Sequence, residues 1–296
     1  MARAHKTFVC SACGATAPKW QGQCPACGAW NSLEPSVVAP QSPASNGAAP
    51  PVRRLADVGT ESVSRVSTGM TELDRTLGGG LVPGSVVLLG GDPGIGKSTL
   101  LLQAATRLRT PGGTLYASGE ESLQQISLRG QRLDADLGAV AAIATTRVED
   151  VLAAVQATRP GCVIVDSIQT MATNLLPSTP GSPNQLRTCA GLLVRLAKQS
   201  GIAVILVGHV TKDGQIAGPR LLEHMVDVVL YFESEVGSRY RVLRAVKNRF
   251  GAANELGIFV MSEGGIREVR NPSALFVSQR GEPVPGSVVT AVHQGS

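Results

Sequence analysis

Short continuous runs of apolar residues recur along the middle of the chain, and a polar or glycine-rich turn follows each of them. Runs of about four to eight apolar residues bounded by such turns are typical of strands that are buried on both faces of a parallel sheet. The strands predicted in this way cover residues 86–89, 114–118, 162–166, 202–207 and 228–232.

Segments with apolar residues at helical spacing alternate with these strands. They predict helices at residues 99–109, 122–133, 148–157, 183–200 and 221–225. Ser182 is the expected N-cap of the fourth helix. Alternation of strands and helices is typical of an α/β domain, in which helices cover both faces of a mainly parallel sheet.

Two hairpins are expected after the last helix. Residues 239–246 follow the strand at 228–232 closely enough to pair with it antiparallel, and residues 257–261 and 266–269 flank a glycine turn. The fold class predicted is therefore α/β, a mainly parallel sheet that ends in antiparallel hairpins.

Composition divides the chain into segments. Residues 1–34 carry four cysteines in pairs, and residues 35–52 are rich in Pro, Ala and Ser, as in a semi-extended linker. The α/β pattern occupies residues 53–270. Residues 271–296 contain strand-like fragments that do not complete a core, so they are expected to be a tail or the start of another domain.

Overall composition narrows the class of protein. Of the 296 residues 43% are hydrophobic but only 3% are aromatic, so the core must be aliphatic. No apolar run approaches the roughly 18–20 residues of a membrane span, and the N-terminus lacks a signal-peptide core. We therefore expect a cytoplasmic protein without a membrane partner. A formal charge of +5 permits contact with nucleic acid but does not indicate it.

One stretch fits the phosphate-binding loop pattern of Gly, four residues, then Gly-Lys-Ser, and it lies between a predicted strand and a predicted helix. This context disfavours the alternative of an ordinary glycine turn. Backbone N–H groups and the helix N-terminus can bind phosphate oxygens, Lys97 can reach the β- and γ-phosphates, and Ser98 can ligate Mg²⁺. The residues predicted to bind nucleotide are Gly91, Asp92, Pro93, Gly94, Ile95, Gly96, Lys97, Ser98 and Thr99.

Acidic residues follow two of the other predicted strands. Glu120 and Glu121 come after 114–118, where one of them could orient or deprotonate the water that attacks the γ-phosphate. They could equally be helix N-terminal charges. Asp166 ends its strand and is the expected Mg²⁺ partner in a phosphate-loop protein.

Basic residues close two further strands. His209 could sense the γ-phosphate, although a lone strand-end histidine is usually only hydrogen-bonded. Lys247 and Arg249 at the end of a hairpin could be solvated, or could reach a phosphate on a neighbouring subunit as arginine fingers do.

The paired cysteines predict a structural Zn²⁺ site. Cys10, Cys13, Cys24 and Cys27 form two Cys-x-x-Cys pairs, which together supply four thiolates and leave no open position. A cytoplasmic setting disfavours disulfides, and the doubled motif disfavours a redox pair.

Four further residues are assigned to cores. Trp20 and Trp30 are predicted to form the small apolar cap of the cysteine module rather than to touch a partner. Cys162 and Cys189 stand alone in apolar surroundings and are expected to be core thiols.

Taken together, these features resemble the RadA (Sms) family of bacterial DNA-repair ATPases, relatives of the RecA recombinase. The resemblance extends from Cys10 to about Ser287, and the last of the stretches that carry it, Lys-Asn-Arg-Phe-Gly, is the family's signature motif. The stretches are residues 19–31, 91–99, 118–122, 166–170, 208–214 and 247–251.

The resemblance implies a RecA-like ATPase core that assembles into a homo-oligomeric ring, a hexamer, with ATP and Mg²⁺ between subunits. It favours Glu120 over Glu121 as the catalytic carboxylate. It also implies that Lys97, Ser98 and Asp166 bind phosphate and Mg²⁺, that His209 senses the γ-phosphate, and that Lys247 and Arg249 act on the neighbouring subunit's nucleotide.

The family threads single-stranded DNA through the ring and promotes branch migration of recombination intermediates alongside RecA. By this resemblance, loops 172–183 and 211–219 are the DNA contacts, and Lys212 and Arg220 are their obvious cations. Family members usually continue into a Lon-like domain that contributes to ring assembly, and residues 271–296 are expected to be its start.

Two other functions share the same core. One is a regulatory or scaffold ATPase whose nucleotide state controls assembly without moving DNA. The other is a nucleotide-gated platform whose zinc ribbon docks a partner such as RecA. The cysteine module and the 247–251 motif favour the repair function.

Overall fold

The computed structural model describes residues 6–10, 15–37, 54, 64–209, 221–234 and 238–269. Most of the predicted linker, the predicted DNA loop at 211–219 and the segment 271–296 therefore lie outside the described residues. No helix within the described ranges is long and apolar enough to cross a membrane.

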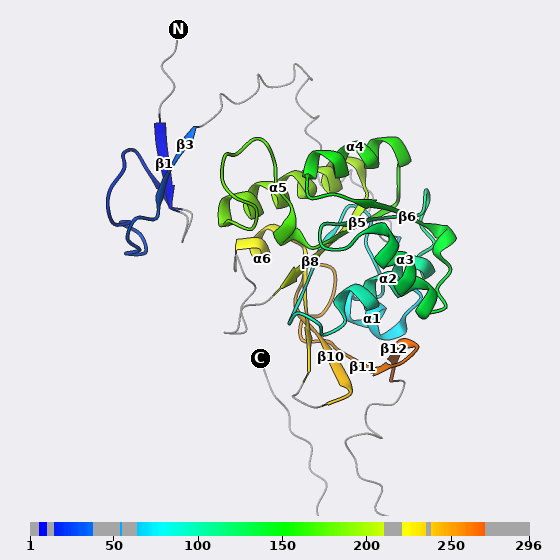
Figure 1. Cartoon of the computed structure of the whole chain (residues 1–296). Helices are drawn as coiled ribbons and strands as arrows, with labels where there is room; N and C mark the ends of the chain where they lie inside the picture. Colours follow the sequence, from blue (N-terminus) through cyan, green and yellow to red (C-terminus); the bar gives the residue numbers. More distant parts are fainter. Residues whose placement is uncertain are drawn as a thin grey trace, which may run out of the picture.

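A large sheet forms the centre of the molecule (Figure 1). Its strands lie in the order β12-β11-β10-β9-β4-β8-β7-β5-β6, with β4 parallel to both β8 and β9. In this order, the strands from β9 through β4, β8, β7 and β5 to β6 pair parallel with their neighbours. The strands from β9 through β10 and β11 to β12 pair antiparallel. The strands are β4 (Val86–Gly91), β5 (Thr114–Ser118), β6 (Val140–Ala144), β7 (Cys162–Asp166), β8 (Ala203–His209), β9 (Val228–Glu233), β10 (Tyr240–Asn248), β11 (Leu256–Ser262) and β12 (Gly265–Glu268).

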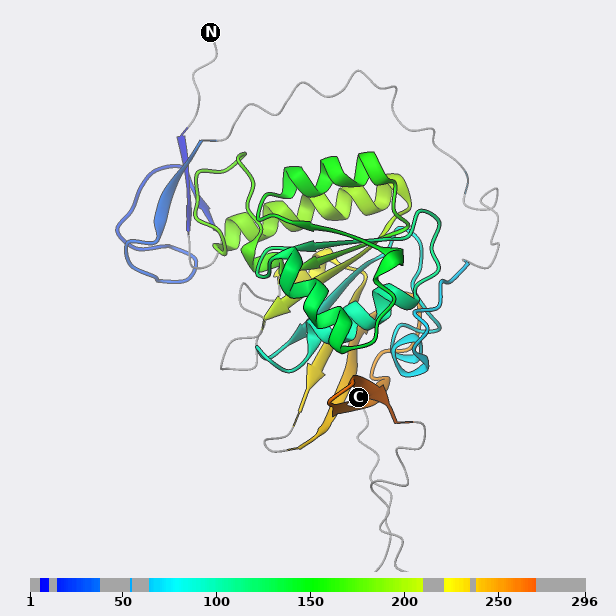
Figure 2. The ribbon, with the colours of Figure 1, turned by 45° about the vertical axis from the view of Figure 1, so that its right-hand side comes forward.

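Helices cover both faces of this sheet (Figure 2). Alternate residues of β4 point to opposite faces: Val87 and Leu89 join one hydrophobic core, and Val86 and Leu88 join the other. The first core includes α1 (Thr71–Thr76), α2 (Lys97–Arg107) and α3 (Leu123–Arg132), and the second includes α4 (Val148–Thr158), α5 (Pro183–Ser200) and α6 (Leu221–Met225).

The predicted α/β class, the five buried strands and both hairpins are confirmed. Ser182 caps α5, as expected, by accepting a hydrogen bond from the Gln185 backbone N–H at 3.5 Å. Strand β6 was not predicted, because it is a half-exposed, alanine-rich strand at the sheet edge without a buried apolar run.

The two single cysteines of the α/β domain are core thiols, as predicted. Cys162 lies in β7 and Cys189 in α5, and both are fully buried. Burial raises the pKa of each thiol to about 12, so neither is a reactive thiolate.

A separate three-stranded ribbon precedes the large sheet, and it consists of β1 (Lys6–Cys10), β2 (Thr16–Ala17) and β3 (Leu33–Val37). Strand β3 continues three residues beyond the range predicted for the cysteine module. The ribbon has a small core of its own, which contains Cys10, Ala17, Cys24 and Leu33.

The expectation that tryptophans form the core of this ribbon is wrong. Trp20 is 54% exposed and Trp30 is 72% exposed. Cys10, Ala17, Cys24 and Leu33 fill the core of the ribbon, with Phe8 and Ala15 packed against them, and neither indole ring is part of it.

Candidate functional site

Strand β4 leads into the glycine loop, and α2 begins at Lys97 directly after it. A side chain at Gly91 would place its Cβ 2.5 Å from the Phe232 carbonyl oxygen. Gly96 has φ of 113°, and a Cβ there would lie 2.6 Å from the Met261 side chain. Only glycine fits both positions, so the tight turn between β4 and α2 requires glycine at 91 and at 96.

Lys97 lies inside the loop, and only 4% of its surface is exposed. Its ammonium group donates hydrogen bonds to the carbonyl oxygens of Gly91 at 2.7 Å and Asp92 at 2.8 Å. Burial lowers the pKa of Lys97, and the charges of Asp166, Glu120 and Asp92 oppose this effect. These three carboxylates are thus close enough to Lys97 to favour its charged form.

Four neighbouring strands end at the same edge of the sheet, because parallel strands carry their carboxyl ends together. In spatial order they are β4, β8, β7 and β5. They bring together the loop, His209, Asp166 and the glutamates after β5. Ligands of open α/β sheets bind at this edge, where the chain order reverses between strands.

Asp166 is 4% exposed at the end of β7. Its Oδ2 accepts a hydrogen bond from the Tyr116 hydroxyl at 2.5 Å. Tyr116 is completely buried in β5, and burial together with the Asp166 charge raises its pKa well above 10. The tyrosine therefore stays a hydrogen-bond donor and fixes the carboxylate.

Glu120 connects the strand ends. Its Oε1 accepts from the Ser167 hydroxyl at 2.5 Å and lies 2.9 Å from His209 Nε2. Burial opposes ionisation of Glu120, but the hydrogen bonds from Ser167 and His209 outweigh it and lower the pKa of the carboxyl group. Lys97 adds to this effect, so Glu120 is a stable carboxylate beside the loop.

Glu121 has a different environment. Its carboxylate forms an ion pair with Arg129 of α3, and its backbone N–H donates to the Ser118 hydroxyl at 2.9 Å. Glu121 is thus tied to the following helix α3 and to the end of β5, while Glu120 faces the ends of β7 and β8.

Lys247 and Arg249 lie at the amino ends of the parallel strands β4 and β9, whereas the glycine loop lies at the carboxyl end of β4. The Arg249 backbone N–H donates to the carbonyl oxygen of Asp227. The Asp227 backbone N–H in turn donates to the carbonyl oxygen of Val86, at the start of β4. Gly91 lies five residue steps along β4 from Val86, or roughly 16 Å. The chain therefore does not bring these two cations to its own loop.

A buried aspartate organises this amino end of the strands. Asp227 is 3% exposed, and its Oδ2 accepts from the Val86 N–H at 2.9 Å and from Lys198 Nζ at 2.6 Å. The Arg249 guanidinium lies 3.6 Å from Oδ1. Lys247 donates to the carbonyl oxygens of Glu223 and Val226 at the end of α6.

The sequence did not identify three residues that support these sites, and they are Tyr116, Ser167 and Asp227. Ser167 directly follows Asp166 and Tyr116 lies in an apolar strand, so proximity to the site was the available signal. Asp227 stands alone before the apolar run of β9, and a lone charge at a buried strand end usually has a partner.

The cysteine sulfurs of the ribbon fit a metal site. Cys10, Cys24 and Cys27 place their sulfur atoms within 4.8 Å of one another, and Cys13 lies outside the described residues. The Cys10 and Cys27 sulfurs are 3.7 Å apart, which matches the separation of about 3.8 Å that Zn–S bonds near 2.3 Å give in a tetrahedron.

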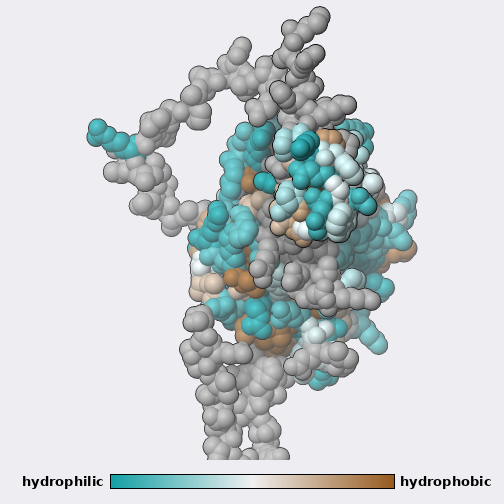
Figure 3. Space-filling model, turned by 90° about the vertical axis from the view of Figure 1, so that its left-hand side faces the viewer, coloured by the Kyte–Doolittle hydropathy of each residue, from teal (hydrophilic) through white to brown (hydrophobic). Residues whose placement is uncertain are grey.

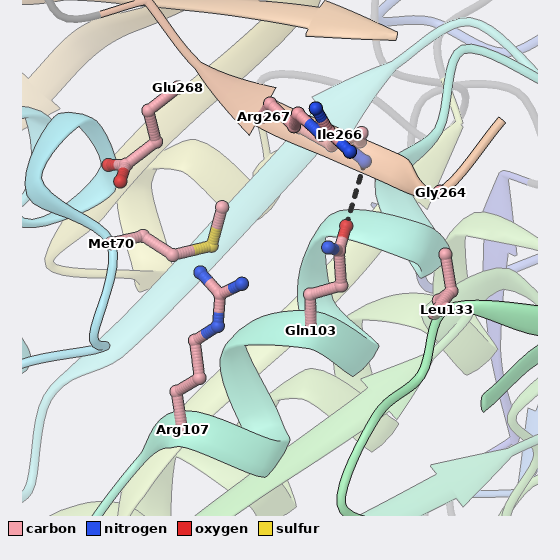
Figure 4. Close-up of a pocket in the computed structure, with 8 residues that line it drawn as sticks. All are labelled: Met70, Gln103, Arg107, Leu133, Gly264, Ile266, Arg267 and Glu268. Atoms are coloured by element: carbon pink, nitrogen blue, oxygen red, sulfur yellow. Dashed lines mark hydrogen bonds between the residues drawn. The ribbon is translucent and has the colours of Figure 1, made fainter. Parts of the chain in front are cut away.

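A second concave region lies away from the loop, between α2 and the β11–β12 hairpin (Figure 4). Gln103 Oε1 accepts the Ile266 N–H at 2.9 Å, so this wall fastens the hairpin to α2. Arg107 and Glu268 line the same pocket, which has a volume of about 270 Å³. Arg267 is a second arginine of the lining, so the pocket carries charges of both signs.

The strand–loop–helix unit, with carboxylates at the ends of adjacent strands, defines the domain as a P-loop nucleotide-binding domain of the RecA-like class. Family models agree: residues 49–215 match the AAA domain, and residues 8–35 match the rubredoxin metal binding domain.

Proteins called DNA repair protein RadA match the whole chain. Identity is 53% for Pseudomonas aeruginosa, 47% for Bacillus subtilis and 47% for Escherichia coli. The chain spans 66% of the length of the first two and 67% of the third. The chain belongs to the RadA family of DNA repair proteins.

Proposed function

We propose that this chain is a DNA-dependent ATPase of DNA repair and homologous recombination, which translocates on single-stranded DNA to promote branch migration together with RecA. One observation carries the proposal: Lys97, Glu120, Asp166 and His209 converge at one edge of the sheet from four separate strand ends. The names of the relatives support the link to DNA repair.

The residues divide the work of phosphoryl transfer. Backbone N–H groups of the glycine loop and Lys97 hold the triphosphate, and Ser98 with Asp166 would hold Mg²⁺, which neutralises charge on the phosphate oxygens. Glu120 orients the attacking water. Its lowered pKa makes it a weak base, so positioning is its main contribution.

His209 is proposed to report the state of the γ-phosphate. It contacts Glu120 through Nε2, and its backbone carbonyl accepts from Gln169 at 3.2 Å. The predicted DNA loop at 211–219 begins two residues later. A change at the phosphate can thus reach the DNA-binding loop through one histidine.

The nucleotide is proposed to lie between subunits of a ring, a hexamer, with Lys247 and Arg249 supplied by the neighbour. Their position at the start of β4, away from the glycine loop of the same chain, supports action in trans rather than on the chain's own nucleotide. Loop 172–183, whose Thr173 contacts Glu149 at 2.6 Å, would line the DNA path.

The ribbon is proposed to bind structural Zn²⁺ through Cys10, Cys13, Cys24 and Cys27. Four thiolates leave the metal no open position, so the ion would hold the ribbon together and take no part in ATP hydrolysis. The domain boundaries predicted from the sequence, 1–34, 35–52, 53–270 and 271–296, are proposed with one change. The ribbon extends to Val37, where β3 ends, so the linker begins at residue 38.

The first prediction tests the ATPase. ATP turnover is measured with and without single-stranded DNA for the wild type and for Lys97→Ala. Single-stranded DNA should raise wild-type turnover, and the variant should lose turnover by about 100-fold or more, since it lacks the loop's cation. Equal turnover in all four mixtures would refute the proposal.

A further inference from the structure

The ribbon displays both tryptophans of the chain on its surface. Trp20 and Trp30 are 54% and 72% exposed, and the sequence has no other tryptophan. The ribbon core is formed by Cys10, Ala17, Cys24 and Leu33, so folding does not use the indole rings. Large aromatic rings that a fold leaves in water often serve recognition.

Backbone contacts order the turn that carries Trp30. Trp30 pairs with Gln23 in an antiparallel bridge, and the Asn31 N–H donates to the Gly22 carbonyl oxygen at 2.7 Å. A Cβ at Gly22 would lie 3.7 Å from the Trp30 ring, so the indole lies over bare backbone. The Gln23 side chain closes the adjoining turn by donating to the Gly28 carbonyl oxygen at 2.9 Å.

The segment of sequence that carries both rings is polar. Residues 15–32 contain Lys19 and several amide side chains, and no Asp or Glu. Figure 3 looks onto this side of the molecule, and the visible face of the ribbon is mostly teal to white. Protein interfaces usually place their aromatic residues in a contiguous apolar centre, which this face does not offer.

We propose that Trp20 and Trp30 form a stacking surface for the bases of single-stranded nucleic acid. Aromatic rings bind bases of any sequence by stacking, while nearby amides and a lysine suit the sugar–phosphate chain. The proposal extends the proposed function by giving the ribbon a DNA contact outside the ATPase domain. It does not require ATP hydrolysis.

The second prediction uses the indoles themselves as reporters. The metal-loaded full chain is titrated with oligothymidylate of about 16 nucleotides, a site size typical of such surfaces. Because these are the chain's only tryptophans, their fluorescence should be quenched as the oligonucleotide binds. Duplex DNA, whose bases are already stacked, should quench much less.

Variants then assign the contact. Trp20→Ala or Trp30→Ala should weaken oligothymidylate binding about 5- to 100-fold, and Trp→Phe at the same position should restore part of the loss. Leu128→Ala, at a residue of α3 that is 64% exposed, is the matched control and should leave affinity unchanged. Metal content of each variant, measured in parallel, shows that the ribbon is folded.

Unquenched fluorescence, or alanine variants with wild-type affinity for the oligonucleotide, would overturn the proposal. If those variants instead lost binding to a RecA filament free of accessible DNA, the surface would be a protein-docking site. The ATPase proposal fails separately, when single-stranded DNA quenches the tryptophans but does not stimulate turnover.

Discussion

Glu120 and Glu121 are adjacent in the sequence, yet the structure gives them unrelated partners. Glu120 binds Ser167 and His209 at the ends of β7 and β8, whereas Glu121 pairs with Arg129 on the helix that follows it. Spacing alone could not separate them, because both follow the same strand. Partners from distant parts of the chain make the distinction, and they favour Glu120 for the reaction.

The third prediction compares these two residues. Glu120→Gln removes the carboxylate that orients the water, so ATP turnover should fall about 10²- to 10⁴-fold while nucleotide binding persists. Glu121→Gln is the control and should change turnover little. Equal losses in steady-state assays would show that the assignment is wrong.

The pH profile of the wild type adds a control. Hydrogen bonds hold the pKa of Glu120 below its ordinary value of 4.5 despite burial, so the group stays charged as pH falls from 8 to that value. Turnover should therefore show no loss from Glu120 protonation above about pH 5. A loss near pH 6 that Glu120→Gln abolishes would contradict this account.

Strands and helices followed closely from the hydrophobic pattern, because apolar residues in β4, β7 and β8 are buried on both faces. The same pattern could not place the tryptophans, since a metal-centred ribbon breaks the link between hydrophobicity and burial. The hydrophobic pattern also could not show that Asp227 joins β4, α5 and the end of β10, because its partners Val86, Lys198 and Arg249 are far apart in sequence.

The fourth prediction concerns the contacts of Asp227. Asp227→Asn keeps the shape but removes the charge that faces Arg249, so kcat should fall several-fold with little change in the KM for ATP. Lys198→Met is the control, because it breaks the other ion pair of Asp227 and leaves Arg249 in place. If both variants lower kcat equally, Asp227 contributes stability rather than positioning of Arg249.

The residues proposed to act on the nucleotide lie at two opposite ends of the sheet's strands. The nucleotide loop, Glu120 and Asp166 lie at the carboxyl ends of the parallel strands, and Lys247 with Arg249 lies at the other end. A single chain therefore holds only half of the proposed ATP site. Head-to-tail contacts that repeat around a ring would bring the two ends together.

The fifth prediction tests this arrangement by mixing two inactive variants. Lys97→Ala lacks the loop cation and Arg249→Ala lacks the group supplied to the neighbour. In a mixed ring, about a quarter of the interfaces pair an intact loop with an intact arginine, if subunits of a head-to-tail ring assemble at random. A mixture of Lys97→Ala with Glu120→Gln is the control, since both changes damage the same side of the interface.

ATP turnover of the equimolar Lys97→Ala and Arg249→Ala mixture, after subunit exchange, is thus the most direct measurement. Recovery toward about a quarter of wild-type turnover, with none in the control mixture, is the predicted result. Turnover no higher than the mean of the two variants measured separately would show that each chain completes its own site.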